Sequence, residues 1–199
     1  MPKIVDHEER RKQIAEATWR VIFNQGMKGA TVRNIAQEAG LSLGALRHYF
    51  STQDELLSFA MRLVKERATQ RIQDIAMREM SPKEKMVQIL LELVPVDEQR
   101  MAEMEVWFAF TFHQKYETIS QNELHQGFFP ELERSLEYLA HHGLLREGLD
   151  LELEAEKLYA IIDGIALHAL LESQRLRPER IIRVLTSHIQ SICKEDETI

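Results

Sequence analysis

Apolar residues recur at helical spacing through almost the whole chain. Ile14, Ala17 and Val21 stand three or four residues apart, which predicts an amphipathic helix over 7–25. With 5 Pro and 8 Gly in 199 residues, the chain is poor in residues that interrupt helices. We therefore predict an all-α fold of about nine helices. The other predicted ranges are 31–39, 42–49, 52–78, 82–94, 98–114, 116–142 (interrupted near Gly127 and Pro130), 150–174 and 178–194.

The stretch over 31–50 combines the features of two short helices joined by a tight turn. Thr31 and Ser42 are residue types that cap helix N-termini, because their hydroxyls accept a backbone N–H of the first turn. Gly40 supplies a turn position where a left-handed backbone costs little. Leu46 falls where the second helix must pack against the first. This order predicts a helix-turn-helix, whose second helix enters the major groove of DNA.

The second short helix presents mostly small and polar side chains once Leu46 is directed inward. Gly44 would allow the backbone to approach DNA closely. Arg47 can pair with guanine or with a phosphate, and His48 can donate to a phosphate. Tyr49 is either a phosphate donor or partly core. The predicted DNA-binding residues are Thr31, Arg33, Ser42, Leu43, Gly44, Ala45, Arg47, His48, Tyr49, Thr52 and Gln53.

Two long helices further on carry recognisable start signals. Thr52 and Glu55 have the spacing of a capping box, and so do Ser81 and Glu84. Free N–H groups at the start of the first of these helices would attract a phosphate. A helix over 52–78 would span about 40 Å at ~1.5 Å per residue, which suits a lever between a ligand site and the DNA-reading helices.

The residues from 8 to 60 resemble the TetR family of bacterial transcriptional repressors. The resemblance rests on the Ile35-Ala36 pair, Ala39-Gly40-Leu41-Ser42, Gly44, Leu46, Tyr49-Phe50 and Glu55-Leu56-Leu57, and the segment Gly44-Ala45-Leu46-Arg47-His48-Tyr49-Phe50 is most similar to the BetI-type branch. It implies a DNA-binding domain over 1–52 and a ligand-binding and dimerisation domain over 53–199. Arg47 and Gln53 depart from the family, which commonly has Tyr and Lys there. Base specificity therefore cannot be transferred from relatives.

Charge is divided unevenly between the N-terminal third of the chain and the rest. The whole chain carries −7, but residues 1–64 hold nine Lys or Arg against seven acids, which leaves −9 for the remainder. A basic head on an acidic body suits a protein that meets phosphates with one end only. Near the N-terminus Lys3, Arg10, Arg11 and Lys12 are either DNA-backbone contacts or a solvated face.

Cellular location and redox state are constrained by simple counts. The single cysteine, Cys193, excludes an intramolecular disulfide and a Cys-rich metal site. The polar N-terminus shows no signal peptide, and no apolar run approaches the ~18–20 residues of a membrane span. We expect a cytoplasmic protein with no cofactor and no metal.

Aromatic residues concentrate in the predicted helix over 98–114. They are explained either as ordinary core or as the lining of a pocket in which Trp107 and Phe110 take part. The resemblance to BetI-type proteins implies a choline-like ligand, and an aromatic face suits a quaternary ammonium. Asp163, in an apolar context, is either a structural residue or a polar anchor of that pocket. The predicted ligand-binding residues are Trp107, Phe110, Thr111, Tyr159 and Asp163.

The last two predicted helices have broad apolar surfaces. In TetR relatives these helices pair with their copies in a four-helix dimer interface, and this segment resembles theirs. Gly164 would allow two helices to approach closely. The predicted dimer-interface residues are Leu158, Ile161, Ile165, Leu185 and Ile189.

Together these features predict a dimeric, ligand-responsive transcriptional repressor. It would bind a near-palindromic double-stranded DNA operator and be released by an inducer that is apolar or a quaternary ammonium. The alternatives are a DNA-binding structural factor without an inducer and a transcriptional activator of the same fold. An enzyme is not expected, because the sequence contains no nucleophile–base motif.

Overall fold

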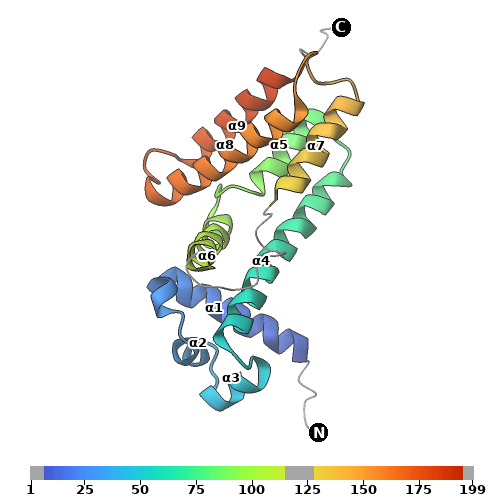
Figure 1. The fold of residues 1–199 in the computed structure, drawn as a ribbon. Coiled ribbons are helices and arrows are strands. Elements are labelled where there is room, and N and C mark those ends of the chain that lie inside the picture. Colours follow the sequence, from blue (N-terminus) through green and yellow to red (C-terminus); the bar gives the residue numbers. More distant parts are fainter. Residues whose placement is uncertain (1–6, 115–127, 195–199) are drawn as a thin grey trace. The chain divides into compact units, whose positions relative to one another are not determined.

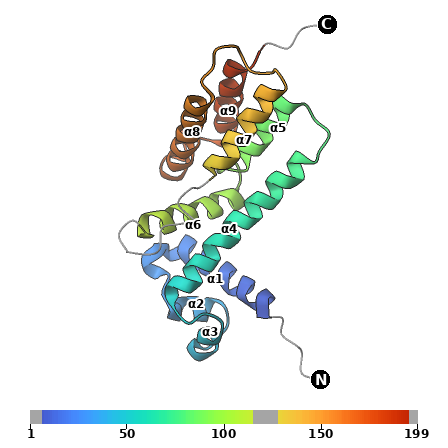
Figure 2. The same cartoon turned by 45° about the vertical axis from the view of Figure 1, so that its right-hand side comes forward.

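The computed structural model describes residues 7–114 and 128–194, and within them it contains nine helices (Figures 1 and 2). The expected all-α fold is confirmed. Lys3 and the first part of the helix predicted over 116–142 lie outside the described residues. The helices are α1 (His7–Gly29), α2 (Val32–Glu38), α3 (Leu43–Tyr49), α4 (Gln53–Ala76), α5 (Pro82–Leu91), α6 (Glu98–Gln114), α7 (Phe129–His141), α8 (Leu151–Leu171) and α9 (Pro178–Ile192). None of the described helices is both long and apolar enough to cross a lipid bilayer.

The chain forms two compact units, which are described separately. The first comprises Met1–Arg67 with Ala102–Ser120, and the second comprises Ala68–Met101 with Gln121–Ile199. This division cuts through α4 and differs from the boundary expected at residue 52. The boundary between a DNA-binding and a ligand-binding domain therefore stays a prediction. The boundary between the two compact units lies between Arg67 and Ala68, within α4.

In the first unit, α1, α2 and α3 pack pairwise around buried aliphatic side chains. Ile14, Ile35 and Leu46 are each at most 1% exposed. The helix predicted to end at residue 25 is interrupted at Gly26, which has a φ of 66° and a non-helical backbone inside α1. Gly40 also has a φ of 66°, and it closes the turn between α2 and α3. These two positive φ angles favour glycine, because a Cβ would be strained there.

The first half of α4 belongs to this unit because α1 binds it. The indole Nε1 of Trp19 donates to the carbonyl of Ala60 at 3.0 Å. The guanidinium of Arg67 lies 4.7 Å from the Trp19 ring centroid and forms an ion pair with Glu16. These contacts hold α4 to α1 as far as Arg67, which explains why the unit extends beyond residue 52.

In the second unit, α5, α7, α8 and α9 lie side by side in both views (Figures 1 and 2). Their shared core is aliphatic, and Leu90, Leu132, Leu136, Leu158 and Leu185 are fully buried in it. The end of α9 is fastened to the loop after α7 by a backbone bridge between Leu145 and Cys193.

The capping predictions had different outcomes. Ser81 and Glu84 form the complete capping box that was predicted at the start of α5. At the start of α4 the Thr52 hydroxyl accepts from the Glu55 N–H at 3.1 Å. The Glu55 carboxylate, however, accepts from the backbone and hydroxyl of Ser51, each at 2.9 Å. The reciprocal half of this box is thus made one residue earlier than expected.

Candidate nucleic-acid interface and ligand-binding region

Helix α3, the predicted DNA-reading helix, is anchored to the core of its unit by two buried side chains. Leu46 and the following Phe50 are each 1% exposed. The Ser42 hydroxyl caps the helix by accepting from the Ala45 N–H at 3.1 Å. This arrangement fixes the rotation of α3, and so it determines which side chains face solvent.

The outward face of α3 carries Leu43, Gly44, Arg47 and His48, all of which are exposed. Leu43 is 41% exposed, which is unusual for a large apolar side chain and suits contact with a thymine methyl. A Cβ built on Gly44 meets no atom of the described chain within 4 Å. Internal packing therefore does not require glycine there, and the position is open to an approaching molecule.

Several predicted DNA-binding residues have structural tasks in the free protein. The hydroxyls of Thr31 and Thr52 cap α2 and α4 by accepting from the N–H of Asn34 at 3.2 Å and of Glu55 at 3.1 Å. Each hydroxyl retains its own hydrogen as a donor for a phosphate oxygen. Gln53 is more committed, because its amide donates to the Ala30 carbonyl at 2.9 Å.

Two other residues of the predicted set differ in exposure. Arg33 is exposed at the start of α2 and is available to a phosphate. Ala45 is only half-buried on α3, so its methyl group remains partly accessible.

An aromatic cluster at the end of α3 includes a residue that sequence reasoning missed. The His7 ring centroid lies 4.9 Å from that of Tyr49, and Tyr49 lies 5.6 Å from His48. His7 is the first residue of α1, far from α3 in sequence, and no spacing pattern connects it with the reading helix. Its imidazole is a further donor beside the expected phosphate contacts.

Arg11 is a structural residue here. Its guanidinium lies 4.6 Å from the ring centroids of both Phe50 and Phe59 and pairs with Glu55 at 3.3 Å. Arg11 is therefore not part of a solvated face, and its contact with the DNA backbone stays a prediction. The basic character of the head therefore depends more on exposed residues such as Arg33 and Arg47.

The predicted ligand-binding residues are divided between the two units. Trp107, Phe110 and Thr111 on α6 belong to the first, where Phe110 is 5% exposed and the other two are half-buried. Tyr159 and Asp163 on α8 belong to the second. On α6, Phe110 therefore packs in the core, whereas Trp107 stays partly accessible. Both interpretations of the aromatic residues, as core and as the lining of a pocket, agree with this arrangement.

The two α8 residues of this set both have raised pKa values. Tyr159 packs edge-on against Phe129, with ring centroids 5.5 Å apart. Burial raises its pKa, and the negative charges of Asp163 and Glu156 add to the effect. Burial also raises the pKa of the Asp163 carboxyl. The half-buried Tyr159 phenol and the exposed Asp163 carboxyl stand one helical turn apart, and both can hydrogen-bond to a bound polar group.

Most of the predicted dimer-interface residues lie in the core of their own chain. Leu158, Ile165, Leu185 and Ile189 are at most 7% exposed and belong to the core of the second unit. Only Ile161 is half-buried. The periodicity correctly identified apolar stripes, but their innermost positions serve the chain's own core and are not available to a partner.

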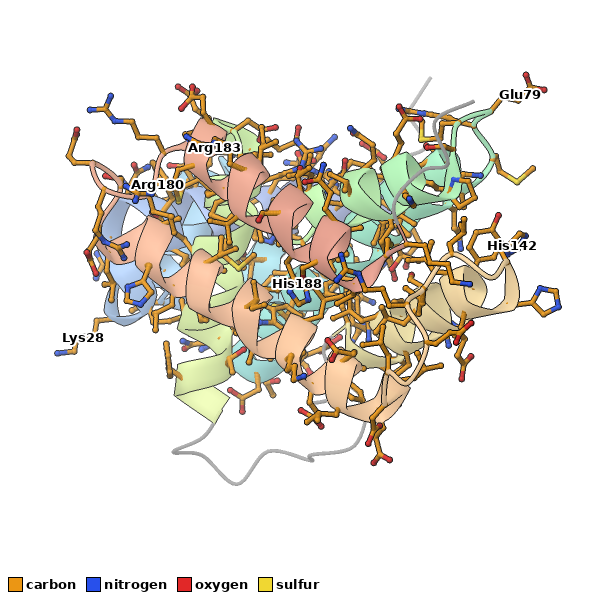
Figure 3. All side chains as sticks on the ribbon, turned by 90° about the horizontal axis from the view of Figure 1, so that it is seen from above. Lys28, Glu79, His142, Arg180, Arg183 and His188 are labelled. Atoms are coloured by element: carbon orange, nitrogen blue, oxygen red, sulfur yellow. The ribbon has the colours of Figure 1, made fainter. Side chains whose placement is uncertain are left out.

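The exposed faces of α8 and α9 carry a different set of apolar residues. Leu171 is 70% exposed, Leu153 51% and Val184 40%. A Cβ built on Gly164 meets no atom of the described chain within 4 Å. His188 lies between α8 and α9 (Figure 3), and its Nε2 atom is buried without a hydrogen-bond partner among the described residues. These features mark a surface of α8 and α9 that is incompletely packed in the single chain.

Comparison with known proteins gives one family match for the N-terminal part of the chain and another for the C-terminal part. Residues 14–71 match the family described as "Bacterial regulatory proteins, tetR family". Residues 82–194 match "BetI-type transcriptional repressor, C-terminal". The chain is 58% identical over 196 residues to the HTH-type transcriptional regulator PksA of Bacillus subtilis (strain 168), covering 98% of this chain and 96% of that protein. It is 31% identical to the regulator BetI of Stenotrophomonas maltophilia (strain R551-3), covering 95% of each.

Solved structures agree with this fold. A transcriptional regulator from Rhodococcus sp. Rha1 superposes with a TM-score of 0.79 at 30% identity, covering 92% of this chain and 95% of that one. A transcriptional regulator from Saccharomonospora viridis in complex with choline has a TM-score of 0.82 at 20% identity, covering 94% of this chain and all of that one. These relatives are regulators and not enzymes, and the chain belongs to the TetR family of bacterial transcriptional regulators, with a C-terminal domain of the BetI type.

Proposed function

We propose that this protein is a dimeric transcriptional repressor that binds a near-palindromic operator and leaves it when a small molecule binds. The observation that carries the proposal is the outward face of α3, where Gly44, Arg47 and His48 are exposed over the buried Leu46. This face has a bidentate donor, a phosphate donor and room for close backbone approach, which are the elements of major-groove reading.

The incompletely packed surface of α8 and α9 supports dimerisation. Burying Leu153, Leu171 and Val184 against a second copy would remove apolar area from water. Gly164 would let two helices approach, and a partner could satisfy the buried Nε2 of His188. A symmetric dimer would place two reading helices about 34 Å apart or slightly more, which is why we expect two inverted half-sites.

Control of DNA binding by a small molecule follows from thermodynamic linkage between the two binding equilibria. A molecule that binds more tightly to the conformation that does not fit DNA shifts the population away from the operator. The partly accessible Trp107 on α6, beside the buried Phe110, favours an apolar molecule or a quaternary ammonium. Choline, which the Saccharomonospora neighbour binds, is the first probe, and titrating it into the protein–operator complex should reduce the bound fraction. A bound fraction that does not change would exclude choline as the inducer.

In vitro transcription distinguishes the repressor from its two alternatives. The template carries an operator selected for binding, overlapping a promoter, and a second template has the operator scrambled. A repressor reduces transcript from the first template only, and an activator increases it. A structural DNA-binding factor affects both templates equally, because its binding is mainly electrostatic and independent of sequence. The expected cellular setting is the cytoplasm, where the chromosome is accessible.

A further inference from the structure

A separate cavity, partly open to solvent, lies in the second unit among α4, α5 and α7. Its volume is about 330 Å³, and its apolar wall includes Ile72, Met86 and Ile89. None of the predicted ligand-binding residues lines it. A largely apolar cavity with a few converging polar groups is the usual form of a small-molecule site in proteins.

One carboxylate oxygen in this cavity has no hydrogen-bond partner in the part of the chain that the structure describes. Glu131, in the first turn of α7, lines the cavity and accepts from Arg134 through Oε1 at 3.2 Å. Its other oxygen, Oε2, is buried and receives no hydrogen bond from the described residues. A buried acceptor without a donor destabilises the folded chain, so this atom is a strong site for an incoming N–H or O–H group.

The charges around the cavity limit the chemistry of the occupant. Two cations line it, and both already have acceptors: Lys85 donates to the Ala76 carbonyl at 2.7 Å, and Arg134 donates to Glu131 at 3.2 Å. With Lys85 and Arg134 against Glu131, the charged lining residues sum to +1, so a cationic ligand meets a net repulsion although Glu131 attracts it. An anionic ligand would bring a negative charge to the Oε2 atom, which can only accept.

We propose that this cavity binds a small uncharged molecule with an apolar body and one hydroxyl or amide donor, which donates to Glu131. The apolar body replaces water along Ile72, Met86 and Ile89, and the donor completes the hydrogen bonding of the carboxylate. This goes beyond the proposed function, because it stands on the cavity alone and holds whether or not occupancy alters DNA binding.

Three eight-carbon probes with different head groups test the proposal on the full chain. The probes are 1-octanol, octan-1-amine and octanoate, and the readout is the methyl NMR spectrum of protein labelled at Ile and Met. We expect 1-octanol to shift the methyl signals of Ile72, Met86 and Ile89 and to bind roughly tenfold more tightly than either charged probe. Shifts confined to methyl groups elsewhere, or tighter binding of the amine or of octanoate, would overturn it.

Two variants and a matched control test the role of Glu131. Glu131→Met removes the acceptor and should weaken 1-octanol binding roughly tenfold while raising the thermal midpoint, because an unpartnered buried oxygen is lost. Glu137→Met, at an exposed position on the same helix outside the cavity, should leave binding unchanged. Ile72→Trp, at a half-buried position of the cavity wall, should narrow the cavity and reduce the shifts of Met86 and Ile89. Unchanged binding in Glu131→Met, or undiminished shifts in Ile72→Trp, would contradict the assignment.

Discussion

The side-chain amide of Gln53 donates a hydrogen bond of 2.9 Å to the backbone carbonyl of Ala30. This bond joins the first residue of α4 to the turn between α1 and α2. Gln53 stands where the family commonly has Lys, and it was predicted to lie near DNA phosphates. The structure adds a second task, because the same side chain fixes the start of α4 relative to the helix-turn-helix.

Replacing Gln53 with Lys tests whether this position faces the DNA backbone. Each additional phosphate contact steepens the dependence of log K on log salt concentration by about 0.9. We expect Gln53→Lys to increase that slope by about this amount and to raise non-specific affinity. Gln53→Ala, which removes the hydrogen bond without adding charge, should lower stability by about 1 kcal/mol at an unchanged slope. If Gln53→Lys gives the wild-type slope, the position does not approach a phosphate.

Arg47 is the exposed cation of α3 and the strongest candidate for reading a base. Arg47→Ala should weaken specific operator binding by about 1–3 kcal/mol and relax the preference at one base pair in each half-site. Titrating operator variants that differ at single positions measures both effects. Arg78→Ala removes an exposed arginine of the second unit and serves as the charge-matched control. A uniform loss over all sequences would instead make Arg47 a phosphate contact.

Glu55 links the stability of the DNA-binding head to pH. The bonds from the Ser51 backbone and hydroxyl, helped by the charges of Arg11 and Arg62, lower the pKa of Glu55 below its ordinary 4.5. A lowered pKa stabilises the folded state above the unfolded pKa, and this stabilisation is lost as pH falls below 4.5 through the folded value.

Thermal midpoints between about pH 3 and 7 measure this effect. We expect Glu55→Gln to lower the midpoint at neutral pH and to flatten its decline in acid. Asp54→Asn, at the exposed carboxylate next to it, should retain the wild-type pH profile. A Glu55→Gln profile parallel to wild type would show that Glu55 carries none of this linkage.

Gly164 provides a test of the proposed dimer surface that does not perturb the monomer. Because a Cβ there meets nothing within 4 Å in the described chain, larger side chains have room in the single chain. Replacing a glycine inside a helix with alanine also favours the helix by about 1 kcal/mol. We expect the series Gly164→Ala, Gly164→Leu to weaken the dimer progressively while helix content and thermal stability of the chain are kept.

Sedimentation over a range of concentrations gives the dimer dissociation constant for this series. Equal dissociation constants for wild type and Gly164→Leu would show that Gly164 does not lie in the interface. Other surfaces of α8 and α9 would then have to form it.

Local signals in the sequence predicted the helices well. Helical periodicity and the caps at Thr31, Ser42 and Ser81 located the starts of α2, α3 and α5. The break at Gly26 also agrees with the predicted end of the first helix. These features depend on residues a few positions apart, so they can be recognised from short stretches of the sequence.

Contacts between distant residues were not accessible in the same way. No spacing rule brings His7 to Tyr49 or directs Gln53 to Ala30, because both pairings depend on how helices pack. Periodicity likewise shows that Leu158 lies on an apolar face, but it cannot tell a chain's own core from a partner's surface. The unpartnered oxygen of Glu131 is visible only when α4, α5 and α7 are together.

The central claim is that two copies of the α3 face read a symmetric DNA site. The most direct test is to select bound sequences from a random duplex pool with the full chain at physiological salt. We predict a near-palindromic consensus whose half-site centres are separated by about one helical turn or slightly more. That enrichment should disappear with Arg47→Ala. A pool that stays random, or a single half-site without a symmetric partner, would contradict the claim.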